Sequence, residues 1–118
     1  MHYKIKKLAR SLGIEFRFGK TPKEAGIPKK VPKKVVACYF NGTGIVFIRT
    51  PLQQPKDYMN MVYLHEIGHA IIDNFELKAR DSVHENMANA IALAFAATLR
   101  LKIPCQILGE FETYAKRR

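Results

Sequence analysis

The spacing of apolar residues changes at Gly13, near the start of the chain. Before this glycine, apolar side chains recur at the three- and four-residue intervals of an amphipathic helix, at Ile5, Leu8, Ala9 and Leu12. After it they alternate with charged residues, at Ile14, Phe16 and Phe18, which is the period of a half-buried strand. We therefore predict a short helix that stops at the glycine and is followed directly by a strand.

Two further strands are predicted on either side of a turn. The runs VVACYF and GIVFIR are rich in β-branched and aromatic residues, and Asn41-Gly42-Thr43 between them is typical of a hairpin turn. Because both faces of the second run are apolar, we expect its strand to be covered on both sides. Residues 19–34 precede the hairpin and contain three Pro, two Gly and six Lys, so we expect a mobile loop there.

The second half of the chain has the pattern of two helices that pack together. Residues 56–75 are apolar nearly all round, as expected of a helix at the centre of a fold. A second helix is predicted over residues 83–102, with Ser82 as its N-cap and a stop at Ile103-Pro104. One face of it carries small residues that allow a close approach to the central helix, at Ala88, Ala92 and Ala96.

Together these elements predict an α+β fold, in which a small antiparallel sheet packs on the central helix and on the alanine-rich helix. A chain of 118 residues with 47% hydrophobic and 25% charged residues has the size and composition of one ordinary globular domain. We expect a single domain, 1–118, with a basic N-terminal part (1–34) and a core (35–104). Residues 105–118 form a C-terminal segment with a possible last helix and a basic tail.

No segment of the sequence is expected to span a membrane. The longest apolar run, MANAIALAFAATLRL, is mostly alanine and is interrupted by Asn89, Thr98 and Arg100. The N-terminus lacks the apolar segment of a secretory signal, so we expect a cytoplasmic protein. Cys38 and Cys105 form no C-x-x-C motif, and we expect both to be reduced and to bind no metal.

The positive charge of the chain is concentrated at one end. Of the net charge of +10, most belongs to residues 1–34, which contain eleven Lys or Arg against two Glu. Residues 35–118 contain nine basic and eight acidic residues and are nearly neutral. The basic third could meet nucleic acid or an acidic partner protein, or it could serve only as a solvated face, and the sequence does not decide between these readings.

The central helix contains the motif HEIGH, a match to H-E-x-x-H. Four residues separate His65 from His69, which places the two imidazoles one helical turn apart, where both can reach one tetrahedral metal ion. Glu66 projects beside the first histidine, where it could take a proton from a water molecule on the metal. The plainer reading is two partly buried histidines with an acidic residue between them. The apolar helical context favours the metal site.

A catalytic zinc site of this kind needs a third protein ligand. We favour Glu85, which lies sixteen residues after His69 on the alanine-lined face of the next helix. Asp73 is one turn further along the HEIGH helix and is better suited to the helix end or to an outer hydrogen bond. His84 would face away if Glu85 faces inward. Asn89, one turn beyond Glu85, could hydrogen-bond a ligating histidine and fix its tautomer.

These residues resemble a known family. The stretch VVACYFNGTGIVFIRTPLQQPKDYMNMVYLHEIGHAII, with HENMANAIALAFAATLRLKIP after it, resembles the ImmA/IrrE-type metallopeptidases over roughly residues 35–104. The resemblance implies a compact zincin fold of the gluzincin type, with one zinc ion bound by His65, His69 and Glu85 and with Glu66 as catalytic base. Known members cleave or regulate DNA-binding repressors. The chain is also similar to short phage-encoded H-E-x-x-H proteins and to minigluzincins, which have Asp at the position of Asn89.

The function we expect is hydrolysis of peptide bonds in a peptide or protein substrate by a zinc-dependent peptidase, with Glu66 activating the water. Candidates for stabilising the oxyanion are Tyr63, Tyr114 and His84, and the sequence does not choose among them. The alternative is a binding or regulatory module of zincin shape that docks nucleic acid or a partner protein through its basic surface. In that case the zinc would be structural or vestigial.

Overall fold

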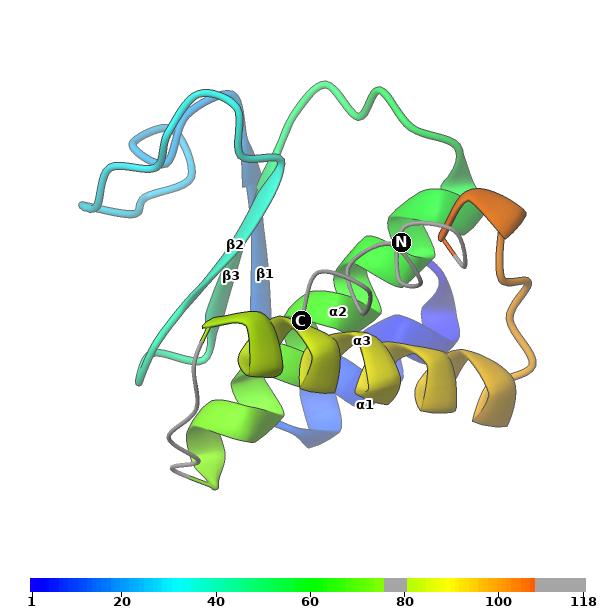
Figure 1. The fold of residues 1–118 in the computed structure, drawn as a ribbon. Helices are drawn as coiled ribbons and strands as arrows, with labels where there is room; N and C mark the ends of the chain where they lie inside the picture. Colours follow the sequence, from blue (N-terminus) through cyan, green and yellow to red (C-terminus); the bar gives the residue numbers. More distant parts are fainter. Residues whose placement is uncertain (76–80, 108–118) are drawn as a thin grey trace.

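The computed structural model describes residues 1–75 and 81–107 and confirms the predicted α+β class (Figure 1). In chain order the elements are α1 (Tyr3–Ser11), β1 (Glu15–Gly19), β2 (Ala37–Phe40), β3 (Ile45–Arg49), α2 (Lys56–Asn74) and α3 (Asp81–Thr98). The helix before Gly13, the strand after it, the hairpin and the HEIGH helix all form where the hydrophobic pattern predicts them.

The three strands form a mixed sheet in the order β1-β3-β2. β2 and β3 pair antiparallel, as the hairpin prediction requires, whereas β1 pairs parallel to β3. The prediction of a purely antiparallel sheet is therefore wrong. The reason is the long loop between β1 and β2. It places β2 two strand positions away from β1, and the hairpin then brings β3 back between them, parallel to β1. β3 is thus the central strand, and its middle residues Val46, Phe47 and Ile48 are fully buried, as predicted.

Residues 20–36, which we call the basic loop, cover the outer face of this sheet. Ile27 is buried against Phe40 and Phe47 in a small apolar cluster of its own. The Arg49 guanidinium donates hydrogen bonds to backbone carbonyls at both ends of the loop, at Lys20, Pro32 and Val35. The loop contains neither helix nor strand. It is held onto the sheet by the buried side chain of Ile27 and by the guanidinium group of Arg49, which has five N–H donors.

The inner face of the sheet packs on α2, which lies between the sheet, α1 and α3 (Figure 1). Ten of the nineteen residues of α2 are buried, including Leu64 and Ile67, which join Val46 and Ile48 in the main core. The prediction that this helix lies at the centre of the fold is confirmed. α1 is tied to the far end of α3 by a hydrogen bond from the Lys4 ammonium to the Leu99 carbonyl, 2.7 Å long.

α2 and α3 approach each other closely at one glycine. Ala88, Ala92 and Ala96 are fully buried on the face of α3 that meets α2, which confirms the predicted small-residue contact. A Cβ atom added to Gly68 would lie 2.9 Å from the Ala88 carbonyl oxygen and 3.0 Å from the Ala88 Cα. The glycine of HEIGH is therefore needed for close packing of the two helices, one turn from Glu85.

The ends of α3 differ from the prediction of residues 83–102. The helix already includes Asp81 and Ser82, so Ser82 is a residue of the first turn and not the N-cap. It ends at Thr98, because Arg100 takes a left-handed conformation (φ 57°) and the chain turns to pack Leu101 against the core. The predicted last helix and the tail fall mainly on residues 108–118, which lie outside the described residues. Within the described ranges no helix is both long and apolar enough to cross a membrane.

Candidate metal centre

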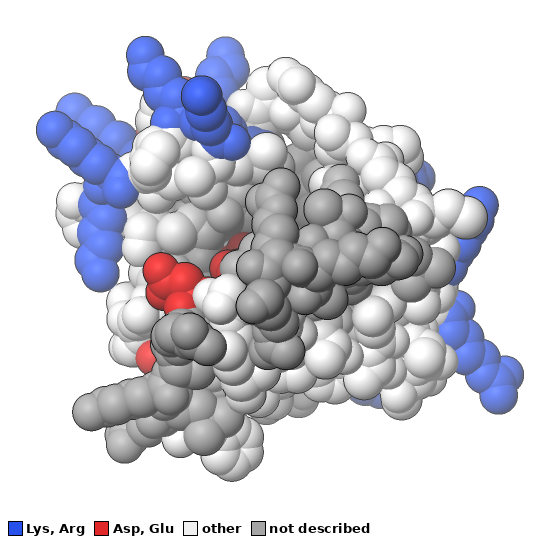
Figure 2. Space-filling view, in the orientation of Figure 1, with Lys and Arg blue, Asp and Glu red and all other residues white. Residues whose placement is uncertain are grey.

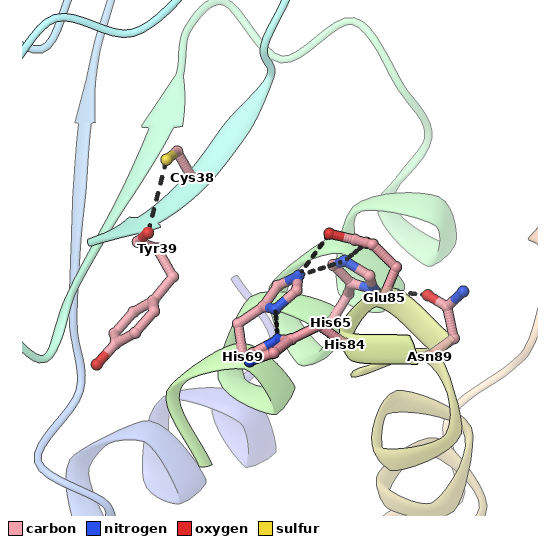
Figure 3. Close-up of polar contacts among 7 residues, drawn as sticks. All are labelled: Cys38, Tyr39, His65, His69, His84, Glu85 and Asn89. Atoms are coloured by element: carbon pink, nitrogen blue, oxygen red, sulfur yellow. Dashed lines mark hydrogen bonds and ion pairs between the residues drawn. The ribbon is translucent and has the colours of Figure 1, made fainter. Parts of the chain in front are cut away.

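Three ligand atoms from two helices converge at one point (Figure 3). The Nε2 atoms of His65 and His69, one turn apart on α2, lie 3.0 Å from each other. Glu85, in the first part of α3, places Oε2 2.9 Å from His65 Nε2 and Oε1 3.0 Å from His69 Nε2. These three side chains form a group that could hold a metal ion, with all ligand atoms within 4.8 Å of one another.

The separations within this group suit a small divalent cation. Two ligands bound at roughly 2.0–2.1 Å to a tetrahedral centre lie about 3.3 Å apart. The observed separations of 2.9–3.0 Å would need to open by only a few tenths of an ångström. Without a metal ion, burial by itself would lower the pKa of His65. The hydrogen bond to Glu85 and the neighbouring negative charges outweigh burial, so the pKa of His65 is raised. The same two imidazoles hold the pKa of Glu85 well below its usual range.

Outer hydrogen bonds orient both imidazoles toward this point. His65 Nδ1 lies 2.6 Å from the side-chain oxygen of Asn89, an atom that only accepts, so Nδ1 carries the proton and donates. His69 Nδ1 lies 3.3 Å from Nδ1 of His84, and the two rings are stacked with centroids 5.4 Å apart. With His69 donating and His84 accepting, both histidines leave Nε2 free for a metal.

The position of His84 corrects one prediction and the position of Asn89 agrees with another. His84 was expected to face away from the site once Glu85 faces inward. Instead, the start of α3 lies alongside His69, so the imidazole of His84 and the carboxylate of Glu85 reach the same histidine from adjacent positions (Figure 3). Asn89 makes the hydrogen bond that its place one turn after Glu85 predicts.

Replacing either outer partner should weaken metal binding without removing a ligand. We expect Asn89→Ala to lower zinc affinity by about 10–100-fold, the usual cost of losing an outer hydrogen bond to a ligating histidine. His84→Ala should cost less, because its contact is longer. Competition with a chelating dye measures both affinities, and Asn74→Ala at the exposed end of α2 is the matched control. Unchanged affinity in Asn89→Ala would show that the asparagine does not orient the ligand.

Asp73 has a different task from the three ligating candidates. Its Oδ2 accepts hydrogen bonds from the Tyr39 hydroxyl and from the Gly42 backbone N–H, each 2.8 Å long. Burial and this carboxylate together raise the pKa of Tyr39. Asp73 therefore fastens the end of α2 to the β2–β3 hairpin, and it is absent from the group that could hold a metal among the described residues.

Glu66 is the one buried acid of the site, with 7% of its surface exposed. Burial raises the pKa of its carboxyl, and the charges of His65 and His69 oppose this effect only in part. The backbone N–H of Tyr39 is a hydrogen-bond partner of the carboxylate. Its Oε2 is buried and has no hydrogen-bond partner among the described residues. A buried oxygen of this kind is suited to accept a proton from a molecule that enters the site.

The site opens into a cleft with a cavity of about 450 Å³. Its walls are β2, α2 and the start of α3, and its lining includes Cys38, Tyr39 and Asn41 beside Glu66, His69, Asp81, His84 and Glu85. The sequence reasoning missed the strand residues. The signal in the sequence that could have indicated them was the position of the hairpin directly before the HEIGH helix.

The cleft also contains a thiol. Burial, and then the charge of Glu66, raise the pKa of the Cys38 thiol, and the nearby charge of Lys29 opposes this rise. Cys38 and Cys105 are both free.

The three candidates for stabilising an oxyanion separate clearly. Tyr63 is buried, packs edge-on against Phe16 and Phe18, and lines a different cavity near the N-terminus. It is therefore wrong as a candidate, because its position on α2 turns it away from the two histidines. His84 lines the cleft, and Tyr114 lies outside the described residues.

Comparison of the chain with known proteins found no relative. No protein-family model, no curated protein and no solved structure matches the chain.

Proposed function

We propose that this chain is a zinc-dependent peptidase with a zincin-like fold. The observation that carries the proposal is the position of Glu66. Glu66 has a buried, unpartnered oxygen and lines the same cleft as His69 and Glu85, whose ligand atoms converge with that of His65. A plain cluster of histidines would not require a second carboxylate beside it with one unpartnered, buried oxygen. The resemblance of residues 35–104 to ImmA/IrrE-type metallopeptidases supports the same conclusion.

Zinc is the metal that we assign to the three ligands. Two imidazoles and one carboxylate, with a fourth position left to solvent or substrate, are the ligand set of hydrolytic zinc sites. Hydrogen bonds from Nδ1 of both histidines are the usual support for such ligands. When bound there, zinc would polarise a carbonyl group and lower the pKa of a water molecule.

The open edge of β2 supports a peptide as the substrate. β2 lies at one end of the strand order and forms a wall of the cleft. The Val36 carbonyl accepts from the Arg49 N–H on β3, so by the alternation of an antiparallel pair the backbone groups of Ala37 and Tyr39 point away from β3. The Glu66 carboxylate already bonds the Tyr39 N–H, and an extended peptide that paired with the remaining backbone groups of this edge would run past Glu66.

In the proposed reaction Glu66 moves one proton. Its carboxylate accepts a proton from water while the water oxygen bonds to the carbonyl carbon of the substrate. The carbon–nitrogen bond then breaks, and Glu66 delivers the proton to the leaving nitrogen. Burial assists the first step, because it raises the pKa of Glu66 and so makes the carboxylate a better base. Asn89 and His84 hold the two imidazoles in place throughout.

Removal of the metal tests the proposal directly. Treatment with a chelator should abolish hydrolysis of an unfolded protein substrate, and one equivalent of zinc should restore it, because zinc is the Lewis acid of the proposed reaction. Mass spectrometry of the elements in the purified protein should give one zinc per chain. Chelator saturated with zinc beforehand is the control. Protein that holds far less than one zinc per chain at neutral pH would contradict the proposal.

A further inference from the structure

The basic loop carries lysines that no described carboxylate neutralises. All of them are exposed: Lys20, Lys23, Lys29, Lys30, Lys33 and Lys34. In the described part of the chain, the ion pairs between side chains involve Arg17, Lys102 and the two ligating histidines instead. The loop's own acid, Glu24, accepts a hydrogen bond from the backbone N–H of Lys20. The ammonium groups therefore present a positive surface to solvent.

The arginines around the loop have a structural task that the lysines do not share. Arg17 donates to the Gly26 carbonyl at 3.1 Å, and Arg49 binds three loop carbonyls while it lies over the Phe47 ring. Ile27 is 4% exposed beneath the loop. The loop is thus preformed, and a ligand that binds its lysines does not have to order the backbone first.

The positive surface borders the cleft at β2. The Lys29 ammonium lies 5.6 Å from the centroid of the Phe40 ring, at the end of that strand. Its charge also acts on Cys38 inside the cleft, where it lowers the pKa of the thiol against burial and Glu66. In Figure 2 one group of Lys and Arg side chains gathers at the upper left, where Figure 1 places the basic loop, and acidic atoms lie below this group.

We propose that the basic loop recognises acidic residues of the peptide substrate next to the bond that is cleaved. This inference rests on the proposed function and adds its substrate class. The metal site and Glu66 act on the backbone of an extended segment lying along β2. The lysines of the loop, which lead directly into β2, bind carboxylates of the same segment a few residues away.

A peptide suits this arrangement better than a nucleic acid does. The cleft is lined by the carboxylates of Glu66, Asp81 and Glu85, so a continuous phosphate backbone entering it would meet negative charge. A peptide can place acidic side chains over the loop and neutral residues over the cleft. The surface of the basic loop is positive and the lining of the cleft is negative. A peptide with acidic residues beside a neutral segment is complementary to both surfaces.

Binding to inactive protein tests this without any need for cleavage. The probe is a labelled extended peptide with a neutral centre and Glu-rich flanks, and the reference peptide has Gln in place of Glu. With Glu66→Gln protein of all 118 residues, fluorescence anisotropy at low salt should give about tenfold tighter binding of the Glu peptide, as expected for a few exposed charge pairs. The preference should shrink at high salt.

Two sets of substitutions localise the effect. Lys29→Gln, Lys30→Gln, Lys33→Gln and Lys34→Gln together should remove the preference for the Glu peptide. The matched control lowers the net charge equally at exposed positions on α1 and at the start of α2, with Lys6→Gln, Lys7→Gln, Arg10→Gln and Lys56→Gln. The control set should keep the preference within about twofold, because distant charges are screened.

The possible outcomes separate this inference from the proposed function. Equal binding of the Glu and Gln peptides, or equal loss in both substitution sets, would overturn the role of the loop. Single-stranded DNA that binds more tightly than the Glu peptide and displaces it would assign the loop to nucleic acid and would also overturn it. If the preference holds in protein that contains no zinc and cleaves nothing, only the peptidase proposal fails. If zinc-dependent cleavage shows no preference for acidic flanks, only this inference fails.

Discussion

Glu66→Gln should lower kcat/KM for peptide hydrolysis by about 10²–10⁴-fold, the range supplied by a positioned general base. The amide has almost the same shape as the carboxylate but cannot accept and return a proton. Glu66 Oε2 has no hydrogen-bond partner among the described residues, so the substitution breaks no contact at that atom. Zinc content and thermal stability should therefore stay close to those of the unmodified protein, and both are measured on the same preparation.

Glu15→Gln is the matched control for this substitution. Glu15 is an exposed glutamate on β1 that pairs with Arg17 and is not among the residues that line the cleft. Its replacement removes the same charge and should leave hydrolysis unchanged. If Glu66→Gln retains full activity with zinc bound, another group must take the proton from water, and the assignment of Glu66 is wrong.

The site residues on α2 could be predicted because their arrangement is local. The helical repeat places His65 above His69 whatever the rest of the chain does, and the same repeat places Asn89 one turn after Glu85. The contact between the two helices was also readable, because Ala88, Ala92 and Ala96 recur on one face. Because α3 packs on α2 through these alanines, Glu85, on the same face of α3, lies next to His65 and His69.

The parts that could not be predicted depend on contacts between distant segments. The parallel pairing of β1 with β3 results from the path of a long loop, about which the strand patterns carry no information. The stacking of His84 on His69 depends on the side-to-side placement of two helices, which a helical wheel does not give. Cys38 enters the cleft because Asp73 holds the hairpin against the end of α2.

The same long-range contacts connect the fold to the site. Gly68 sits within the HEIGH motif and sets the approach of α3, so packing and ligand geometry depend on the same few residues. Asp73, on the next turn, sets the position of β2 and thus of the strand edge beside Glu66. The motif therefore contains two of the proposed ligands and the proposed base, together with the glycine whose close packing brings Glu85 to them.

Glu85→Ala should lower zinc affinity by more than about 100-fold, because it removes a ligand, whereas loss of an outer hydrogen bond costs about 10–100-fold. Two imidazoles alone leave the metal with half of its four positions filled by solvent. Zinc that binds only the native state would also stabilise the fold. At a zinc concentration about 100 times the Kd of the unmodified protein, the free energy of unfolding should rise by about 2.7 kcal/mol.

In Glu85→Ala the same zinc concentration should raise the free energy of unfolding by about 0.4 kcal/mol or less, if the affinity falls 100-fold. Chemical denaturation with and without zinc measures both values. Asp81→Ala is the control, since Asp81 lies one turn earlier on α3, lines the same cleft and carries the same charge, but belongs to no ligand group. It should keep nearly the full stabilisation. Equal losses in the two variants would show that Glu85 acts only through its charge, and the third ligand would have to come from elsewhere.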